Sequence, residues 1–205
     1  MLASFVSALS LLVVTAHPPV MEGDIVFHVS DTPQAAAVSA ATGSPIGHVG
    51  IVTLVDGEPH VYEAAGPVGM VSLAQFKRRG VGGKLWVKRL KDRDQVLTPQ
   101  VLARMRKVAR SYQGRPYDLY FQWSKARLYC SELVYDIYLV GAGVSIGQVQ
   151  QVGDLDLTSK IVKRLITKRF KRQLKRPLDK SELIITPVAM FEDPRLMTVS
   201  APEGD

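Results

Sequence analysis

Three residues of this sequence, Cys130, His48 and Glu63, have the side-chain types that a thiol enzyme needs. Cysteine catalysis requires a thiolate, a base that accepts and returns a proton, and a third group that orients the base. Cys130 is the only cysteine among the 205 residues. The reaction that such a set of side chains performs is attack on a carbonyl carbon.

Cys130 is predicted to lie at the start of a helix. The apolar residues that follow it have helical spacing, and Gly-Ala-Gly at 141–143 predicts the helix end. Unpaired backbone N–H groups and the helix dipole favour a thiolate at this position. Free cysteine is also among the most buried residue types, so inert packing is the alternative role.

A predicted β-hairpin brings His48 and Glu63 together. Two strand-like runs flank Asp56-Gly57, a strong signal for a two-residue turn. This turn makes His48 and Glu63 diagonal neighbours on one sheet face, roughly 7–8 Å apart between backbones. It places His60 and Tyr62 on the opposite face. A register shift of one residue would reverse the assignment.

His48 and Glu63 each have a structural alternative. A single histidine in a strand is more often a packed residue than a catalytic one, but glycines at 47 and 50 leave room beside this imidazole. Glu63 lies in a run that is otherwise suited to burial, and buried carboxylates are rarely unpaired. Pairing with a histidine would account for a buried carboxylate at Glu63.

The remaining pattern supplies the elements that must position these residues. We expect strands at 23–29 and 84–90, helices at 33–42, 72–79 and from 98 to about 114, and a candidate edge strand at 184–187. Residues 66–71 are expected to form a loop. His28, inside the first strand, is assigned a structural role.

Length and composition indicate one globular domain with short appendages. The chain has 46% hydrophobic and 22% charged residues, which is ordinary for a folded protein. One cysteine cannot form an internal disulfide, so the cysteine count does not identify the compartment. The four histidines lack metal-ligand spacing, and we expect neither a metal nor a cofactor.

The positive charge is concentrated in one segment. The net charge is +7, and residues 160–176 contain nine Lys and Arg and no acid, so the rest of the chain carries about −2. The segment is helical by period with an apolar stripe. It is either a solvated face or a contact for an anionic membrane surface. We expect no nucleic-acid binding, because the basic patch is a single helix without a recognised binding module.

The N-terminus resembles an export signal. Residues 1–16 are apolar and end in small residues, which predicts a cleaved signal peptide and a periplasmic or cell-envelope location. The run is too short to span a bilayer. No basic residue precedes it, so a packed N-terminal helix and a cytoplasmic location remain alternatives. Residues 201–205 are expected to form a loose tail.

Five short motifs, in one order, resemble the YiiX/YebB-like branch of the NlpC/P60 superfamily. The motifs are Gly23-Asp24-Ile25-Val26-Phe27, Ser44-Pro45-Ile46-Gly47-His48-Val49-Gly50-Ile51, Tyr62-Glu63-Ala64, Gly114-Arg115-Pro116-Tyr117-Asp118 and Tyr129-Cys130-Ser131-Glu132-Leu133-Val134. That branch consists of circularly permuted papain-like hydrolases, in which the histidine precedes the cysteine, as it does here. The resemblance implies an α+β domain over residues 22–200, with an antiparallel sheet packed against helices.

The resemblance also implies roles for the candidate residues. Cys130 is similar to the family's nucleophile, His48 to its base and Glu63 to its orienting group, and Tyr117 and Tyr129 are candidates for lining the substrate site. The implied activity is a thiol hydrolase that cleaves amide or ester bonds of a cell-envelope peptide or lipid through a Cys130 thioester. The alternatives are a lipid acyltransferase of the lecithin:retinol type and a catalytically idle lipid- or peptide-binding module.

Overall fold

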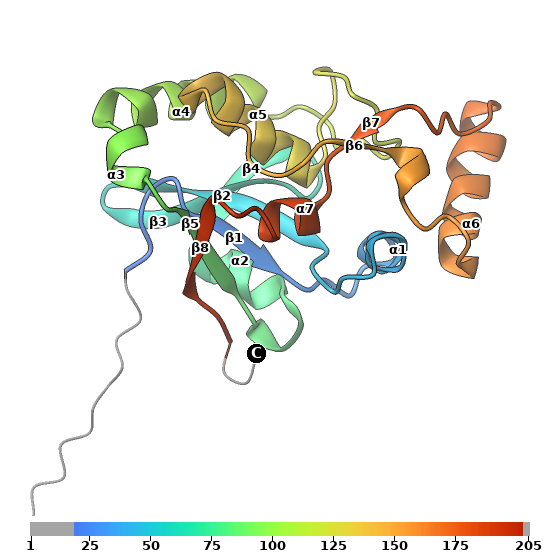
Figure 1. Cartoon of the computed structure of the whole chain (residues 1–205), viewed down its shortest axis with the longest axis horizontal. Helices are drawn as coiled ribbons and strands as arrows, with labels where there is room; N and C mark the ends of the chain where they lie inside the picture. The colour runs from blue at the N-terminus through green and yellow to red at the C-terminus, as the bar shows by residue number, and fades with distance from the viewer. Residues whose placement is uncertain (1–18, 203–205) are drawn as a thin grey trace, which may run out of the picture.

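A six-stranded antiparallel sheet forms the centre of the computed structural model, which describes residues 19–202 (Figure 1). The spatial order of its strands is β4-β3-β2-β1-β5-β8. Their bounds are Ile25–His28 (β1), His48–Val55 (β2), Glu58–Ala64 (β3), Val68–Ser72 (β4), Trp86–Leu90 (β5) and Leu196–Ser200 (β8). The expected signal peptide and the last three residues of the expected tail lie outside the described residues.

The predicted hairpin is confirmed, with its register. Asp56 and Gly57 both have positive φ, at 50° and 84°, which gives the turn the twist that a two-residue hairpin needs. Thr53 pairs with His60, and Ile51 with Tyr62. β2 also pairs with β1, so the hairpin extends into the middle of the sheet.

Helices cover both faces of the sheet, and those predicted at 33–42, at 72–79, from 98 and from 130 match the predicted bounds closely, whereas α3 and α7 were not predicted. α4 and α5 pack over one face, and α2 packs on the other (Figure 1). The two faces carry separate clusters of buried apolar side chains, because successive residues of a strand point to opposite sides. The bounds are Leu73–Arg79 (α2), Arg93–Val96 (α3), Pro99–Tyr112 (α4), Cys130–Ala142 (α5) and Pro187–Phe191 (α7).

Two strand predictions differ from the structure. Residues expected to form a loop after Gly66 form the edge strand β4, which is held by pairing with β3. The other edge strand is β8 rather than 184–187. At 184–187, Thr186 caps α7 and Pro187 occupies its first turn, so the strand β7 (Leu183–Ile184) stops early. It pairs with β6 (Gln150–Gln151) in a separate small sheet.

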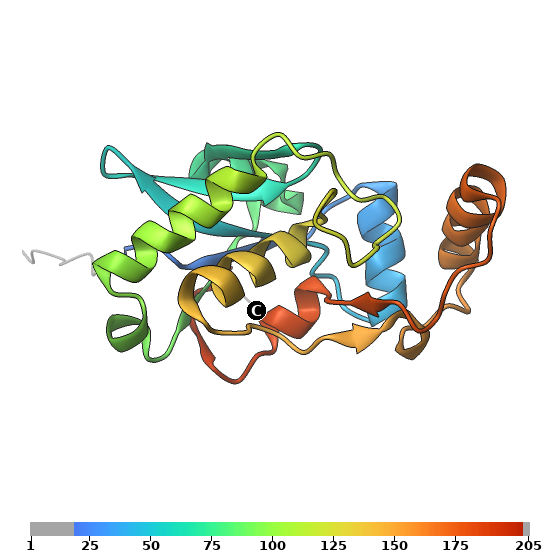
Figure 2. The ribbon, with the colours of Figure 1, turned by 90° about the horizontal axis from the view of Figure 1, so that it is seen from above.

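A helical segment on the far side of α1 (Pro33–Thr42) forms a separate wall (Figure 2). It consists of α6 (Lys160–Ile166) and its π-helical continuation η3 (Thr167–Leu174). Val162 and Phe170 are buried on its inner side. Its exposed basic side chains are Lys160, Lys163, Arg164, Lys168, Lys171 and Arg172, and the exposed Lys175 follows its last residue. Short 3₁₀ turns at Val81–Gly83 (η1) and Val152–Asp154 (η2) complete the fold. No helix within residues 19–202 has the length and apolar character to cross a membrane.

Candidate active site

The structure brings Cys130, His48 and Glu63 together. Glu63 Oε2 lies 2.7 Å from His48 Nε2, which leaves Nδ1 as the ring nitrogen for the cysteine. The His48 ring lies close enough to the Cys130 thiol for their interaction to raise the pKa of His48 and lower the pKa of Cys130. Cys130 is 5% exposed and is the first residue of α5. The three side-chain types of a thiol enzyme therefore form one continuous chain of contacts.

These residues meet at the beginning of β2. His48 and Glu63 share a sheet face, as the hairpin predicted, and that face is the one covered by α2. The Phe76 ring of α2 stacks on His48 with centroids 5.5 Å apart. α5 covers the other face, so Cys130 reaches the imidazole at the strand end and not across the sheet. A Cβ at Gly47, at that end, would lie 3.0 Å from the Ala35 side chain, so the glycine allows α1 to approach the start of β2 closely.

The hydrogen bonds of the triad oppose the effect of burial on both titrating groups. Burial lowers the pKa of His48, but the bonds to Cys130 and Glu63 outweigh burial and raise it to about 9. Burial raises the pKa of the Cys130 thiol, but the His48 hydrogen bond and charge outweigh it, and the pKa is lowered. The arrangement therefore favours a thiolate beside an imidazolium.

Backbone N–H groups also surround the thiol. Tyr129 is the N-cap of α5, and its side chain makes no capping bond, so the first N–H groups of the helix have no side-chain cap. The backbone N–H groups of Val49 and Ser131 lower the pKa of Cys130 and so favour its thiolate. Groups of this kind stabilise negative charge on sulfur or on an attacked carbonyl oxygen.

Tyr117 and Tyr129, the two tyrosines expected near the substrate, both line the cavity that contains Cys130. The Tyr117 hydroxyl accepts a hydrogen bond from the Gln34 side chain. The Tyr129 hydroxyl accepts one from the Ile185 backbone N–H at 3.2 Å, and Tyr129 is almost fully buried. This hydrogen bond connects the start of α5 to the segment that contains Ile185.

Sequence reasoning missed two residues that contact the pair. Arg79, at the end of α2, forms an ion pair with the second Glu63 oxygen. His28 pairs with His48 in the β1–β2 register, and the ring centroids are 5.0 Å apart. His28 is buried, and burial and the nearby His48 charge lower its pKa to about 4. No local signal identifies either contact, because both depend on segments that meet only in the folded chain.

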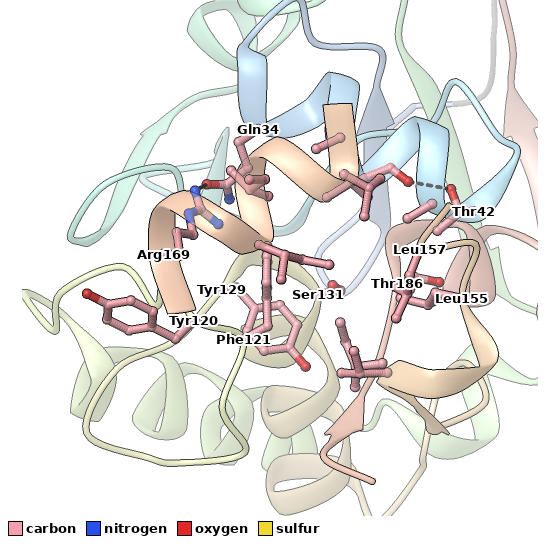
Figure 3. Close-up of a pocket in the computed structure, with 18 of the residues that line it drawn as sticks. Gln34, Thr42, Tyr120, Phe121, Tyr129, Ser131, Leu155, Leu157, Arg169 and Thr186 are labelled. Atoms are coloured by element: carbon pink, nitrogen blue, oxygen red, sulfur yellow. Dashed lines mark hydrogen bonds between the residues drawn. The ribbon is translucent and has the colours of Figure 1, made fainter. Parts of the chain in front are cut away.

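An apolar cavity opens on Cys130. Figure 3 shows part of its wall, including Tyr129, Ser131 and Leu157. It holds about 830 Å³ of space free of atoms, its open mouth included. Its walls come from α1, the start of α5, the 152–157 segment, α6, η3 and the 184–187 segment. The apolar lining residues include Ala37, Val38, Ala41, Val152, Leu155, Leu157, Val162, Leu165, Ile166, Phe170, Leu178 and Ile184.

A second, more polar pocket adjoins the cavity on the side of His48. It is lined by His48, Arg79 and the residues 30–32, among others. Gln34, Gly47 and Tyr117 line both spaces. The cysteine thus faces the apolar space and the histidine faces the polar one, with the two spaces meeting at these three residues.

Comparison with known proteins identifies the family. The model of the permuted papain-like amidase enzymes (YaeF/YiiX, C92 family) matches residues 19–200. The chain belongs to this family. It is therefore a cysteine hydrolase of amide bonds, with the permuted papain-like fold that the sequence motifs implied.

Two YiiX proteins illustrate the similarity within the C92 family. The chain is 35% identical over 178 residues to the uncharacterized protein YiiX of Escherichia coli K12, covering 87% of this chain and 85% of that protein. It also matches the crystal structure of YiiX from Escherichia coli O157:H7 with a TM-score of 0.80 and 32% identity. That match covers 88% of this chain and 97% of the other.

The crystal structure of that relative is described as a metalloprotein. Within residues 19–202 of the present chain, no group of three or more His, Cys, Asp or Glu side chains is placed to hold a metal ion. The described residues therefore do not fit a metal centre built from three or more such side chains.

Proposed function

We propose that this C92 amidase cleaves the amide bond of a substrate with a long apolar chain, through a thioester on Cys130. The observation that carries the proposal is the apolar cavity that opens on the cysteine. A peptide backbone would leave its polar groups unpaired among these aliphatic walls, at a free-energy cost. A lipid-type acyl chain gains about 0.8 kcal/mol for each buried CH₂.

Cys130 is the nucleophile and His48 is the acid and base in the proposed reaction. The thiolate attacks the carbonyl carbon, and N–H groups at the start of α5 stabilise the oxyanion. The C–N bond breaks, and the imidazolium gives its proton to the leaving nitrogen. Water then attacks the thioester while His48 takes its proton, which releases the acid and restores the thiolate. Glu63 orients the imidazole throughout and stabilises its charged form.

The same thioester accommodates acyl transfer. If an amine or alcohol replaces water in the second step, the acyl group passes to that acceptor, with the same proton transfer to His48. The apolar cavity favours this second candidate function as much as hydrolysis, because both reactions begin with the same acyl-enzyme. The fate of the acyl group distinguishes them.

Anionic membrane is the proposed source of the substrate. The helical segment α6–η3 has apolar side chains on its cavity side and six exposed cations elsewhere on its surface. Cations near an anionic bilayer contribute about 1 kcal/mol each. Docking through these cations would bring the wall of the apolar cavity close to the lipid.

Acyl-enzyme formation tests the proposed function directly. Incubation with N-dodecanoyl-4-nitroanilide should release nitroaniline and add one dodecanoyl group to the Cys130 peptide, as seen by mass spectrometry. Cys130→Ala should abolish the adduct, the release and iodoacetamide labelling. Because of the cavity, the dodecanoyl substrate should exceed the butanoyl one in kcat/KM by at least about tenfold. Turnover by Cys130→Ala, or no preference for the longer chain, would contradict the proposal.

A further inference from the structure

The apolar cavity contains one buried cation that the proposed reaction does not use. Among the described residues that line it, Arg169 is the only one with a permanently charged side chain. Arg169 belongs to η3 and is only 7% exposed. Its guanidinium lies against Gln34 on the cavity wall, as Figure 3 shows.

Arg169 has hydrogen-bond partners but no carboxylate. Its guanidinium donates to the Leu119 carbonyl oxygen and to Gln34 Oε1, both at 2.6 Å. None of the salt bridges found within residues 19–202 includes it. A guanidinium has five N–H donors, and these two bonds use only two of them. No Arg169 nitrogen is among the fully buried side-chain atoms of the described residues that lack a hydrogen-bond partner, so the remaining donors are accessible to a ligand. Burial lowers the pKa of Arg169, but an arginine remains a cation at neutral pH.

Arg169 has no direct ion pair, although the charge of the nearby Asp118 favours the cation. Buried charges are normally paired, because removing an ion from water costs several kcal/mol. The neighbouring Phe121 ring, 5.7 Å from the guanidinium carbon, recovers only part of that cost. A ligand that brings its own anion would form the direct ion pair that Arg169 lacks within residues 19–202.

Two polar side chains connect Arg169 to the catalytic end of the cavity. Gln34 accepts from Arg169 through Oε1 and donates to the Tyr117 hydroxyl through Nε2. Tyr117 lies close enough to Cys130 for the thiolate charge to raise the pKa of Tyr117, in addition to the larger effect of burial. Tyr117 and Gln34 line the place where the apolar and polar spaces meet. Seen from Cys130, the Arg169 cation lies beyond these two side chains.

We infer that Arg169 and Gln34 form an anion-binding subsite for a carboxylate or phosphate carried by the apolar-chain substrate. The inference rests on the proposed function, since it uses the same cavity, and it narrows the substrate class to anionic amphiphiles. The planar guanidinium suits both oxyanions, because two parallel N–H groups match two oxygens. The remaining chain of the ligand lies along the aliphatic walls.

Binding of matched ten-carbon probes tests the subsite without catalysis. Decanoate, decyl phosphate and decan-1-ol share a chain and differ in the head group, and calorimetric titration of the full-length protein gives each Kd. At least one anion should bind at least about tenfold more tightly than decanol. The better of the two anions identifies the oxyanion as carboxylate or phosphate.

Arg169→Met should remove this preference and leave the decanol Kd within about twofold. Lys168→Met is the matched control, because it removes an exposed charge from the same helix and should change none of the three Kd values. Arg169→Gln, which keeps an amide donor near the Leu119 carbonyl, replaces the methionine variant if that variant fails to fold.

Two results would overturn the subsite. One is equal binding of decanol and both anions by the wild-type protein. The other is an anion preference that survives in a folded Arg169 variant. Failure of the proposed function gives a different result from failure of the subsite. If the cavity does not bind apolar chains, none of the ten-carbon probes, decanol included, would bind.

Discussion

The proton between His48 and Cys130 decides which state of the site is reactive. Glu63 occupies Nε2 of the imidazole at 2.7 Å, and Arg79 holds the other carboxylate oxygen. Burial raises the pKa of Glu63, but the His48 and Arg79 contacts outweigh it and lower it. The carboxylate is thus kept ionised and fixed in orientation, which supports a charged imidazole.

The pH profile follows from the directions of these shifts. The thiolate exists above the lowered pKa of Cys130, and the imidazolium exists below the raised pKa of His48, about 9. Between these values the reactive ion pair predominates. We therefore expect a bell-shaped dependence of kcat/KM on pH, whose upper limb falls near pH 9.

Steady-state kinetics across pH, with the nitroanilide substrate, measures this profile. Glu63→Gln removes one group that raises the His48 pKa, so its upper limb should move to lower pH. His48→Ala should lower kcat/KM by about 10²- to 10⁴-fold. An unchanged upper limb in Glu63→Gln would contradict the assignment of that limb to His48.

At the scale of elements, the site depends on how closely β2, β3 and α2 approach one another. Gly50 lies where these three elements meet. A Cβ at Gly50 would lie 2.4 Å from Val61 Cγ1, 3.0 Å from the Tyr62 carbonyl oxygen and 3.1 Å from Phe76 Cε2. Phe76 in turn stacks on His48, so packing at Gly50 is coupled to the imidazole.

Gly50→Ala should therefore destabilise the fold by about 1–3 kcal/mol, because the added methyl group overpacks the contact. Equilibrium unfolding in urea measures the change. Gly69→Ala in β4 is the control, since its nearest atom would be 3.8 Å away, and it should stay within about 0.5 kcal/mol of wild type. Equal stability of the two variants would show that the sheet adjusts at Gly50.

At the scale of the whole molecule, one helical segment carries exposed cations on its outer surface and apolar side chains on the side that lines the cavity. The helical segment α6–η3 lies at one end of the molecule, separated from the sheet by α1 (Figure 2). The apolar stripe that the sequence indicated is not free to enter a bilayer, because its residues Val162 and Phe170 are buried and line the cavity. Membrane contact through this segment would therefore be mainly electrostatic.

Binding to vesicles of phosphatidylglycerol and phosphatidylcholine tests that contact. A variant that reverses Lys163, Lys168 and Lys171 to Glu should bind about a hundredfold more weakly, given about 1 kcal/mol for each cation near the surface. Salt should weaken wild-type binding in the same way. Cosedimentation measures both effects.

A triple variant elsewhere controls for net charge. Lys77, Lys107 and Arg110 are exposed on α2 and α4, and their reversal to Glu changes the net charge equally. This control should bind much like the wild-type protein. Equal losses in the two variants would mean that net charge, and not the α6–η3 face, determines binding.

The sequence by itself determined the local parts of the site. Asp56-Gly57 fixed the hairpin register, because a two-residue turn with positive φ admits one pairing, and that register put His48 beside Glu63. Helical spacing and the terminal glycines identified α5 and its first residue, Cys130. The five motifs, in their permuted order, identified the family.

Only the tertiary structure decided the contacts between distant segments. The pairing of β1 with β2 places His28 against His48. No tight turn joins these two strands, so the sequence has no local signal that predicts the pairing. The edge strands β4 and β8 exist because neighbouring strands pair with them. Arg79 reaches Glu63, and Arg169 reaches Gln34 across 135 positions of chain. Such contacts arise from long-range packing, which residue spacing does not encode.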